Sequence, residues 1–175
     1  MPKPIVITGG PGVGKTTVIE LLRKRGYTVV DETAREIIER EMAKGSDVLP
    51  WKNLKAFQDS VFARQLEKET RAGESVGSIP IFLDRSIVDG YAYSVLGNVF
   101  PVSDIARLAP GRYTKVFLLE RLPDYVTDTS RIEDLQFAKD IHAEILKAYR
   151  EFGYEVVHVP VLPPEERVDF IIRNL

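Results

Sequence analysis

Residues 9–16 read GGPGVGKT, which fits the pattern G-x-x-x-x-G-K-[ST] without a gap. The apolar run Ile5–Ile7 precedes this segment and a helix-like segment, residues 17–25, follows it, in the order that the motif requires. Glycines let the backbone curl so that successive N–H groups converge, and the N-terminus of the next helix adds a positive dipole end. The sequence therefore predicts a phosphate-binding loop between a buried strand and a helix.

The loop assigns roles to individual residues. Lys15 is expected to reach the β- and γ-phosphates, and the Thr16 hydroxyl is expected to hold Mg²⁺. The predicted phosphate-binding residues are Gly9, Gly10, Pro11, Gly12, Val13, Gly14, Lys15, Thr16 and Thr17, with Arg121 from a later segment. A glycine-rich turn without function is disfavoured by the flanking strand and helix. The dinucleotide pattern G-x-G-x-x-G fails, because Lys15 stands where the third glycine is required.

Composition limits the other possibilities. The 175 residues are 44% hydrophobic, which suits one soluble domain spanning residues 1–175. The net charge is −2 and no long basic run occurs, so duplex nucleic acid is not an expected partner. The absence of cysteine excludes disulfides, thiolate zinc and cysteine nucleophiles. No signal peptide or membrane-spanning run is recognisable, which predicts a cytoplasmic protein without a transmembrane segment.

Apolar strand-like runs alternate with helix-like segments five times. The runs lie at residues 5–8, 27–30, 79–83, 116–119 and 155–159. This alternation predicts a three-layer α/β domain, with a parallel sheet covered by helices on both faces. His142 falls in a helical pattern and His158 in a strand, without metal-ligand spacing, so both are predicted to be structural.

Charged residues follow two of the predicted strands. Asp31 and Glu32 come after the second run, and Asp84 with Arg85 after the third. Ligands of open α/β sheets bind at the carboxyl ends of strands, and an acidic residue there is suited to Mg²⁺ or its water shell. Asp84 is therefore a predicted metal ligand together with Thr16. For Asp31 and Glu32 a role at the start of the next helix remains an alternative, as does a surface salt bridge for Arg85.

A polar segment at about residues 121–133 lies between the fourth strand and a long helix. It contains Arg121 and Arg131, and it is predicted to be a lid that closes over the site. Phosphoryl transfer needs such cations, because charge develops on the transferred oxygens. A solvated loop is the alternative.

Nearly the whole chain resembles the family of small ATPases that includes the ribosylnicotinamide kinase domain of bacterial NadR. The resemblance is carried by GGPGVGKTT, by VVDETAR at Val29–Arg35, by FLDRS at Phe82–Ser86, by YVTDTSRIE at Tyr125–Glu133 and by the terminal VPVLPPEERVDFI. It implies the P-loop kinase fold, with a five-stranded parallel sheet in the order 2-3-1-4-5.

The site pattern is also similar to that of deoxyribonucleoside kinases. The similarity implies that Glu32 acts as base toward a sugar hydroxyl and that Phe57-Gln58 meets the nucleobase. Thr33 departs from the pattern, since a proline usually follows the glutamate in that family. The acceptor-binding residues expected on this basis are Arg35, Phe57, Gln58, Arg85 and Tyr91.

These patterns together predict a phosphotransferase that uses ATP or GTP with Mg²⁺ and moves the γ-phosphoryl group to a hydroxyl of a small nucleoside-like molecule. Its expected catalytic residues are Lys15, Asp31, Glu32, Asp84, Arg85 and Arg131. The alternative is a regulatory switch that binds GTP or ATP and hydrolyses it slowly, with a lipid or a protein as its partner. The acceptor, the choice between ATP and GTP, and the oligomeric state are left open by the sequence.

Overall fold

The computed structural model describes residues 4–74, 80–123 and 135–175. Within them a five-stranded parallel sheet has the order β2-β3-β1-β4-β5. The strands are β1 Ile5–Thr8, β2 Thr28–Val30, β3 Ile81–Asp84, β4 Lys115–Leu119 and β5 Val156–Val159. The predicted fold class and sheet order are confirmed.

Seven helices accompany the sheet in the described residues. They are α1 Lys15–Lys24, α2 Thr33–Ala43, α3 Leu54–Glu74, α4 Ile87–Leu96, α5 Ile105–Leu108, α6 Leu135–Glu151 and α7 Pro164–Arg173. Helix α3 extends to Glu74, so that Gly73 is helical.

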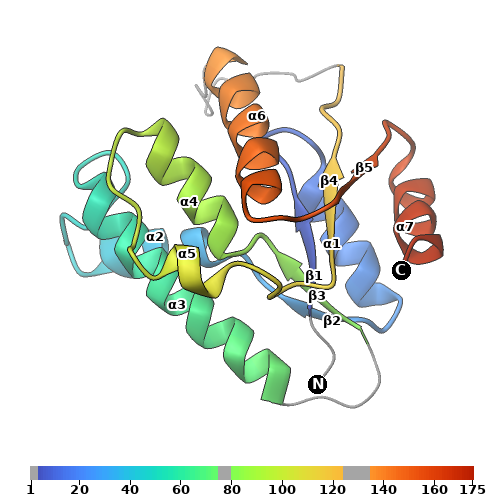
Figure 1. Cartoon of the computed structure of the whole chain (residues 1–175), viewed down its shortest axis with the longest axis horizontal. Coiled ribbons are helices and arrows are strands. Elements are labelled where there is room, and N and C mark those ends of the chain that lie inside the picture. The colour runs from blue at the N-terminus through green and yellow to red at the C-terminus, as the bar shows by residue number, and fades with distance from the viewer. Residues whose placement is uncertain (1–3, 75–79, 124–134) are drawn as a thin grey trace.

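The helices form two layers because the strands alternate their side chains between two apolar clusters. Val6 of β1 faces a cluster that includes α4, α5 and α6, against which side chains of α3 also pack. Its neighbours Ile5 and Ile7 face a second cluster, which is built with α1 and α7. Figure 1 shows the sheet between these two layers. Both faces are covered, which explains why β1 and β3 are apolar at consecutive positions.

The strand register brings the chemically important segments to one edge. Ile7 of β1 pairs with Asp84 of β3, and Thr8 pairs with Leu118 of β4. The phosphate loop, which follows β1, therefore lies between the residues that follow β3 and those that follow β4. All the candidate residues that the structure describes at strand ends meet at this carboxyl edge.

Candidate active site

The phosphate loop connects β1 to α1 through glycines in left-handed conformations. Gly12 has φ 74° and Gly14 has φ 80°, values that L side chains rarely adopt. Gly14 is also the N-cap of α1, and it provides no side-chain cap for the first N–H groups of the helix. The loop therefore offers main-chain donors and the positive end of α1 to an anion.

Lys15 is the first residue of α1 and is only 8% exposed. Its ammonium group forms an ion pair with the Asp84 carboxylate at the end of β3 and lies 3.9 Å from Glu32 Oε2. A buried cation requires such partners, because leaving water is costly for an isolated charge. The lysine of the loop and the two acidic candidates thus form one cluster.

Arg85 joins the same cluster from the other side. Its Nε lies 3.0 Å from Glu32 Oε1, its Nη1 lies 3.3 Å from Asp89 Oδ1, and its guanidinium lies 5.4 Å from the ring centroid of Tyr93. The backbone of Arg85 has φ 68°, a value that is rare for residues other than glycine. Hydrogen bonds hold this conformation, because Arg85 N donates to Ile7 O (3.1 Å) and Gln65 Nε2 donates to Arg85 O (3.3 Å).

The two carboxylates respond differently to this environment. Burial acts to raise the pKa of Glu32, but Arg85 and Lys15 outweigh it and lower the net pKa. Burial raises the pKa of Asp84, against the opposing effect of Lys15. Glu32 is therefore held ionised at neutral pH, the state that accepts a proton.

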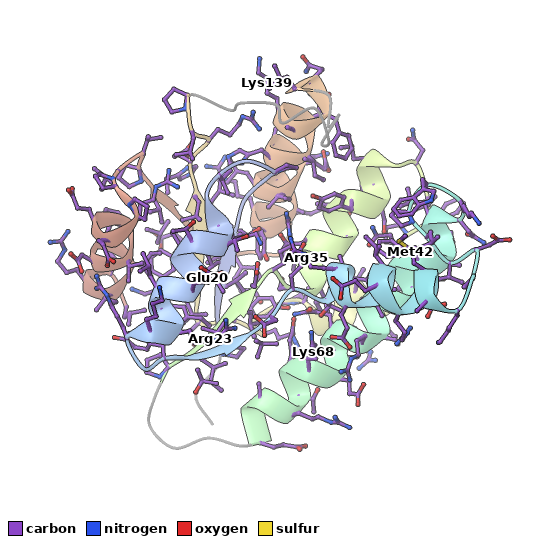
Figure 2. The ribbon with its side chains drawn as sticks, turned by 180° about the vertical axis from the view of Figure 1, so that it is seen from behind. Glu20, Arg23, Arg35, Met42, Lys68 and Lys139 are labelled. Carbon is purple, nitrogen blue, oxygen red and sulfur yellow. The ribbon has the colours of Figure 1, made fainter. Side chains whose placement is uncertain are left out.

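Asp31 and Glu32 are separated by the turn into α2. Glu32 is the N-cap of α2 and faces Lys15 and Arg85, although its side chain makes no cap bond. The Asp31 carboxylate is exposed and pairs with Arg23 of α1 at 2.5 Å, while its main-chain oxygen accepts a bond from Lys68 (3.0 Å). Figure 2 labels Arg23 and Lys68 on their two helices.

The donor set suits Mg²⁺ through oxygen atoms. Thr16 lies in the first turn of α1, next to Lys15, and Asp84 contacts Lys15 directly. Hydroxyl and carboxylate oxygens are hard ligands, and Mg²⁺ bound with a nucleotide takes few protein ligands besides phosphate and water. The described residues contain no group of three or more acidic or histidine side chains that would form an all-protein metal site.

The acceptor-side candidates are spread over α2, α3 and α4. Phe57 and Gln58 are buried in α3, Tyr91 of α4 donates a hydrogen bond to Glu151, and Arg35 is exposed on α2 where Figure 2 labels it. Gln58 and Tyr91 line a small cavity of about 10 Å³. Gln58 Oε1 is buried and has no hydrogen-bond partner among the described residues. An unsatisfied buried acceptor costs roughly 1–3 kcal/mol, so this atom is suited to a donor, and the adjoining cavity is large enough for about one water molecule.

The lid prediction is only partly covered by the structure. Arg121 follows β4, and its Nη1 lies 3.5 Å from Pro11 O of the phosphate loop. Arg131, and residues 124–133 of the predicted lid, lie outside the described residues.

Sequence patterns missed several residues that hold the site together. Buried Asp89 accepts bonds from the Tyr149 hydroxyl (2.6 Å), from Ser86 N (2.9 Å) and from the Thr8 hydroxyl. The Ser86-x-x-Asp89 spacing of a capping box was an available signal. His142, which was predicted to be structural, accepts a 3.1 Å bond from Gly10 N of the loop. No local pattern reveals a contact between residues so far apart in the chain.

The family of AAA domains matches residues 4–167 of the chain. A nucleotide-binding protein of Fusobacterium nucleatum is 25% identical over 151 residues, which cover 81% of this chain and 50% of that protein.

No helix in the described part of the chain is long and apolar enough to cross a membrane.

Solved structures share the fold at low sequence identity. A crystal structure of a NadR protein in complex with NR matches with a TM-score of 0.72 and 21% identity, covering 98% of this chain and 51% of that one. A deoxyadenosine kinase from M. mycoides matches with a TM-score of 0.67 and 17% identity, covering 98% of this chain and 97% of that one. The chain thus spans about half the length of the Fusobacterium relative and of the NadR protein.

Proposed function

The chain belongs to the AAA domain family, and we propose that it is a P-loop phosphotransferase. In this proposal it moves the γ-phosphoryl group of a nucleoside triphosphate to a hydroxyl of a nucleoside-like acceptor. The phosphate loop and Lys15 would bind the triphosphate. Thr16 and Asp84 would hold Mg²⁺, which neutralises phosphate charge when it is bound. Arg85 and the lid arginines Arg121 and Arg131 would stabilise the charge that develops during transfer.

The observation that carries the proposal is the position of Glu32. This carboxylate lies 3.9 Å from the Lys15 ammonium and 3.0 Å from Arg85, so it is close to the expected phosphates and is kept ionised. A nucleotide-binding switch does not require a carboxylate there. In the proposed reaction Glu32 takes the proton of the acceptor hydroxyl, the acceptor oxygen bonds to the γ-phosphorus, and the bond to the β-phosphate oxygen breaks to release the diphosphate.

The acceptor class is supported by the environment of Gln58. Its unpartnered Oε1 would accept from an N–H donor of a nucleobase or a carboxamide through one water molecule, which is what the adjoining cavity of about 10 Å³ can hold. Phe57, its neighbour in the chain, is also buried. The related folds include a NadR protein in complex with NR and a deoxyadenosine kinase, which supports a nucleoside-like acceptor.

The test compares two adjacent carboxylates. Purified protein is incubated with Mg²⁺, ATP or GTP and a panel of nucleosides, and the phosphorylated acceptor is measured by mass spectrometry. Glu32→Gln should lower transfer by ~10²-fold or more, which is the range of general bases, and leave nucleotide affinity near that of the wild type. Asp31→Asn is the matched control and should transfer normally, because its carboxylate faces Arg23. If Glu32→Gln transfers the phosphoryl group at the normal rate, Glu32 is not the base of the reaction.

The same experiment separates the kinase from the regulatory switch. A switch would bind the nucleotide and hydrolyse it slowly, and no acceptor in the panel would be phosphorylated or would accelerate turnover. That result would replace the phosphotransferase proposal with the second function.

A further inference from the structure

Arg167 is a buried cation outside the cluster described above. It belongs to α7, it is 2% exposed, and it is among the largest fully buried side chains. None of the ion pairs between described residues includes it, although burial of a guanidinium normally requires an acidic partner. Its location therefore needs an explanation other than a salt bridge.

The guanidinium is bound instead by three main-chain oxygens from three separate segments. Nη1 donates to Val13 O of the phosphate loop (2.5 Å), Nη2 to Glu120 O after β4 (3.0 Å) and Nε to Pro160 O after β5 (3.0 Å). A planar fork with donors on all three nitrogens can satisfy these oxygens at once, which a lysine cannot do. Arg167 thus connects the loop to the ends of two neighbouring strands.

The bond to Val13 has a geometric consequence for the loop. In a trans peptide the C=O and the following N–H point in opposite directions. Because Val13 O points to Arg167, the N–H of Gly14 points away from Arg167. The guanidinium also packs against Gly14, since a Cβ at that position would lie 3.6 Å from Nη1. The orientation of this peptide, which lies one peptide unit before Lys15, is therefore set by a residue of the last helix.

We infer that Arg167 is a positioning residue for polyphosphate binding: it fixes the Val13–Gly14 peptide so that the Gly14 N–H is available to the phosphates. The inference rests on the proposed function, in which the loop binds a nucleoside triphosphate. Burial lowers the pKa of Arg167 against the opposing effect of Glu120, and the guanidinium remains protonated. Its three nitrogens donate to main-chain oxygens and not to a carboxylate, so the positive charge is retained next to the loop.

The experiment measures binding of two probes to the full chain with Mg²⁺ by titration calorimetry. The probes are the preferred nucleoside triphosphate and inorganic tripolyphosphate, which lacks base and sugar. Arg167→Met should weaken both by ~10-fold or more, and Arg167→Lys should weaken both to a smaller extent, because a lysine keeps the charge but not the fork. Circular dichroism and urea unfolding establish that each variant is folded. Should Arg167→Met fail to fold, the Arg167→Lys variant decides the test alone.

Arg25→Met is the matched control. Arg25 also connects α7 to the rest of the protein, through surface pairs with Glu165 (2.8 Å) and Asp169 (2.5 Å). Its loss should leave the affinity for both probes unchanged. An equal loss of affinity in Arg25→Met would show that the weaker binding comes from the general packing of α7 on the protein, and would overturn the inference.

Two other outcomes would also overturn it. Wild-type affinity for both probes in the Arg167 variants would remove the positioning role while leaving the phosphate loop in place. A loss confined to the nucleoside triphosphate, with tripolyphosphate unaffected, would place the effect of Arg167 at the base and sugar. Failure of the wild type to bind either probe would instead refute the proposed function itself, and with it this inference.

Discussion

At the scale of single residues, the site pairs its buried charges. Lys15 and Arg85 provide two positive charges, while Glu32, Asp84 and Asp89 provide three negative ones, and every one of them has an oppositely charged neighbour in the cluster. A bound triphosphate would compete with Asp84 for Lys15. The Asp84 carboxylate would then be free to hold a divalent cation in place of the lysine, which would keep each of these charges paired.

His142 supplies a pH-dependent contact to the loop. Its Nδ1 must be unprotonated to accept the bond from Gly10 N, and burial lowers its pKa, with Arg121 and His158 acting in the same direction and Glu120 opposing them. A histidine with a lowered pKa in the folded state is neutral there, while the unfolded chain binds the proton near pH ~6.5. Stability is therefore full above that pH and falls as the pH drops through it.

We expect His142→Gln to reduce this pH dependence, because a glutamine oxygen can accept from Gly10 N without titrating. Urea unfolding at pH 8, 7, 6 and 5 measures the free energy of unfolding of both proteins. The wild type should lose about 1 kcal/mol more than the variant between pH 8 and 5, which is the size of one hydrogen bond. Parallel pH profiles for the two proteins would assign the acid sensitivity to other groups.

At the scale of elements, α6 and the phosphate loop are packed without space between them. A Cβ built on Gly10 would lie 3.0 Å from Ala138 O and 3.0 Å from His142 Cβ, both on α6. The main-chain contact is rigid, so the helix would have to move to admit a methyl group. Gly10 is thus required by α6, independently of any ligand.

Gly10→Ala should therefore lower the free energy of unfolding by about 1–3 kcal/mol, the typical effect of overpacking. Gly73→Ala is the matched control, because Gly73 is helical and a Cβ there meets nothing within 4 Å. Alanine should stabilise that position by roughly 0.5–1 kcal/mol. Urea unfolding of the two variants tests the sign of each effect, and a Gly10→Ala protein as stable as the wild type would show that α6 moves freely against the loop.

The elements also show what sequence can and cannot predict here. Ile5–Ile7 and the run before Asp84 predicted strands correctly, because burial on both faces leaves a continuous apolar signal. The choice between Asp31 and Glu32 could not be made, since neighbouring side chains at a turn point in different directions and only the backbone decides which one enters the site. The bond from Arg167 to Val13 joins residues 154 positions apart, and it leaves no periodic trace in the sequence.

At the scale of the whole molecule, the alternation of strands and helices predicted a parallel sheet between two helical layers. The strand order 2-3-1-4-5, which the structure has, was implied by the resemblance to P-loop kinases and not by the alternation itself. This order places the loop at the carboxyl edge between the ends of β3 and β4. The polar contacts that His142 and Arg167 make with the loop could not be predicted, because they depend on how α6 and α7 pack on the sheet. Asp89 differs, because its capping-box spacing with Ser86 is visible in the sequence.

Because the loop is joined to both helical layers, we expect nucleotide binding to stabilise the whole domain. A ligand at 100 times its Kd adds about 2.7 kcal/mol to the free energy of unfolding. For a chain of 175 residues this corresponds to a rise in Tm of roughly 7 °C. A thermal-shift series with ATP and GTP, each with and without Mg²⁺, measures the rise and identifies the preferred nucleotide. Lys15→Ala should show less than a third of this rise in Tm at the same nucleotide concentration, because the principal phosphate contact is lost. An equal shift in Lys15→Ala would mean that the nucleotide binds elsewhere on the protein.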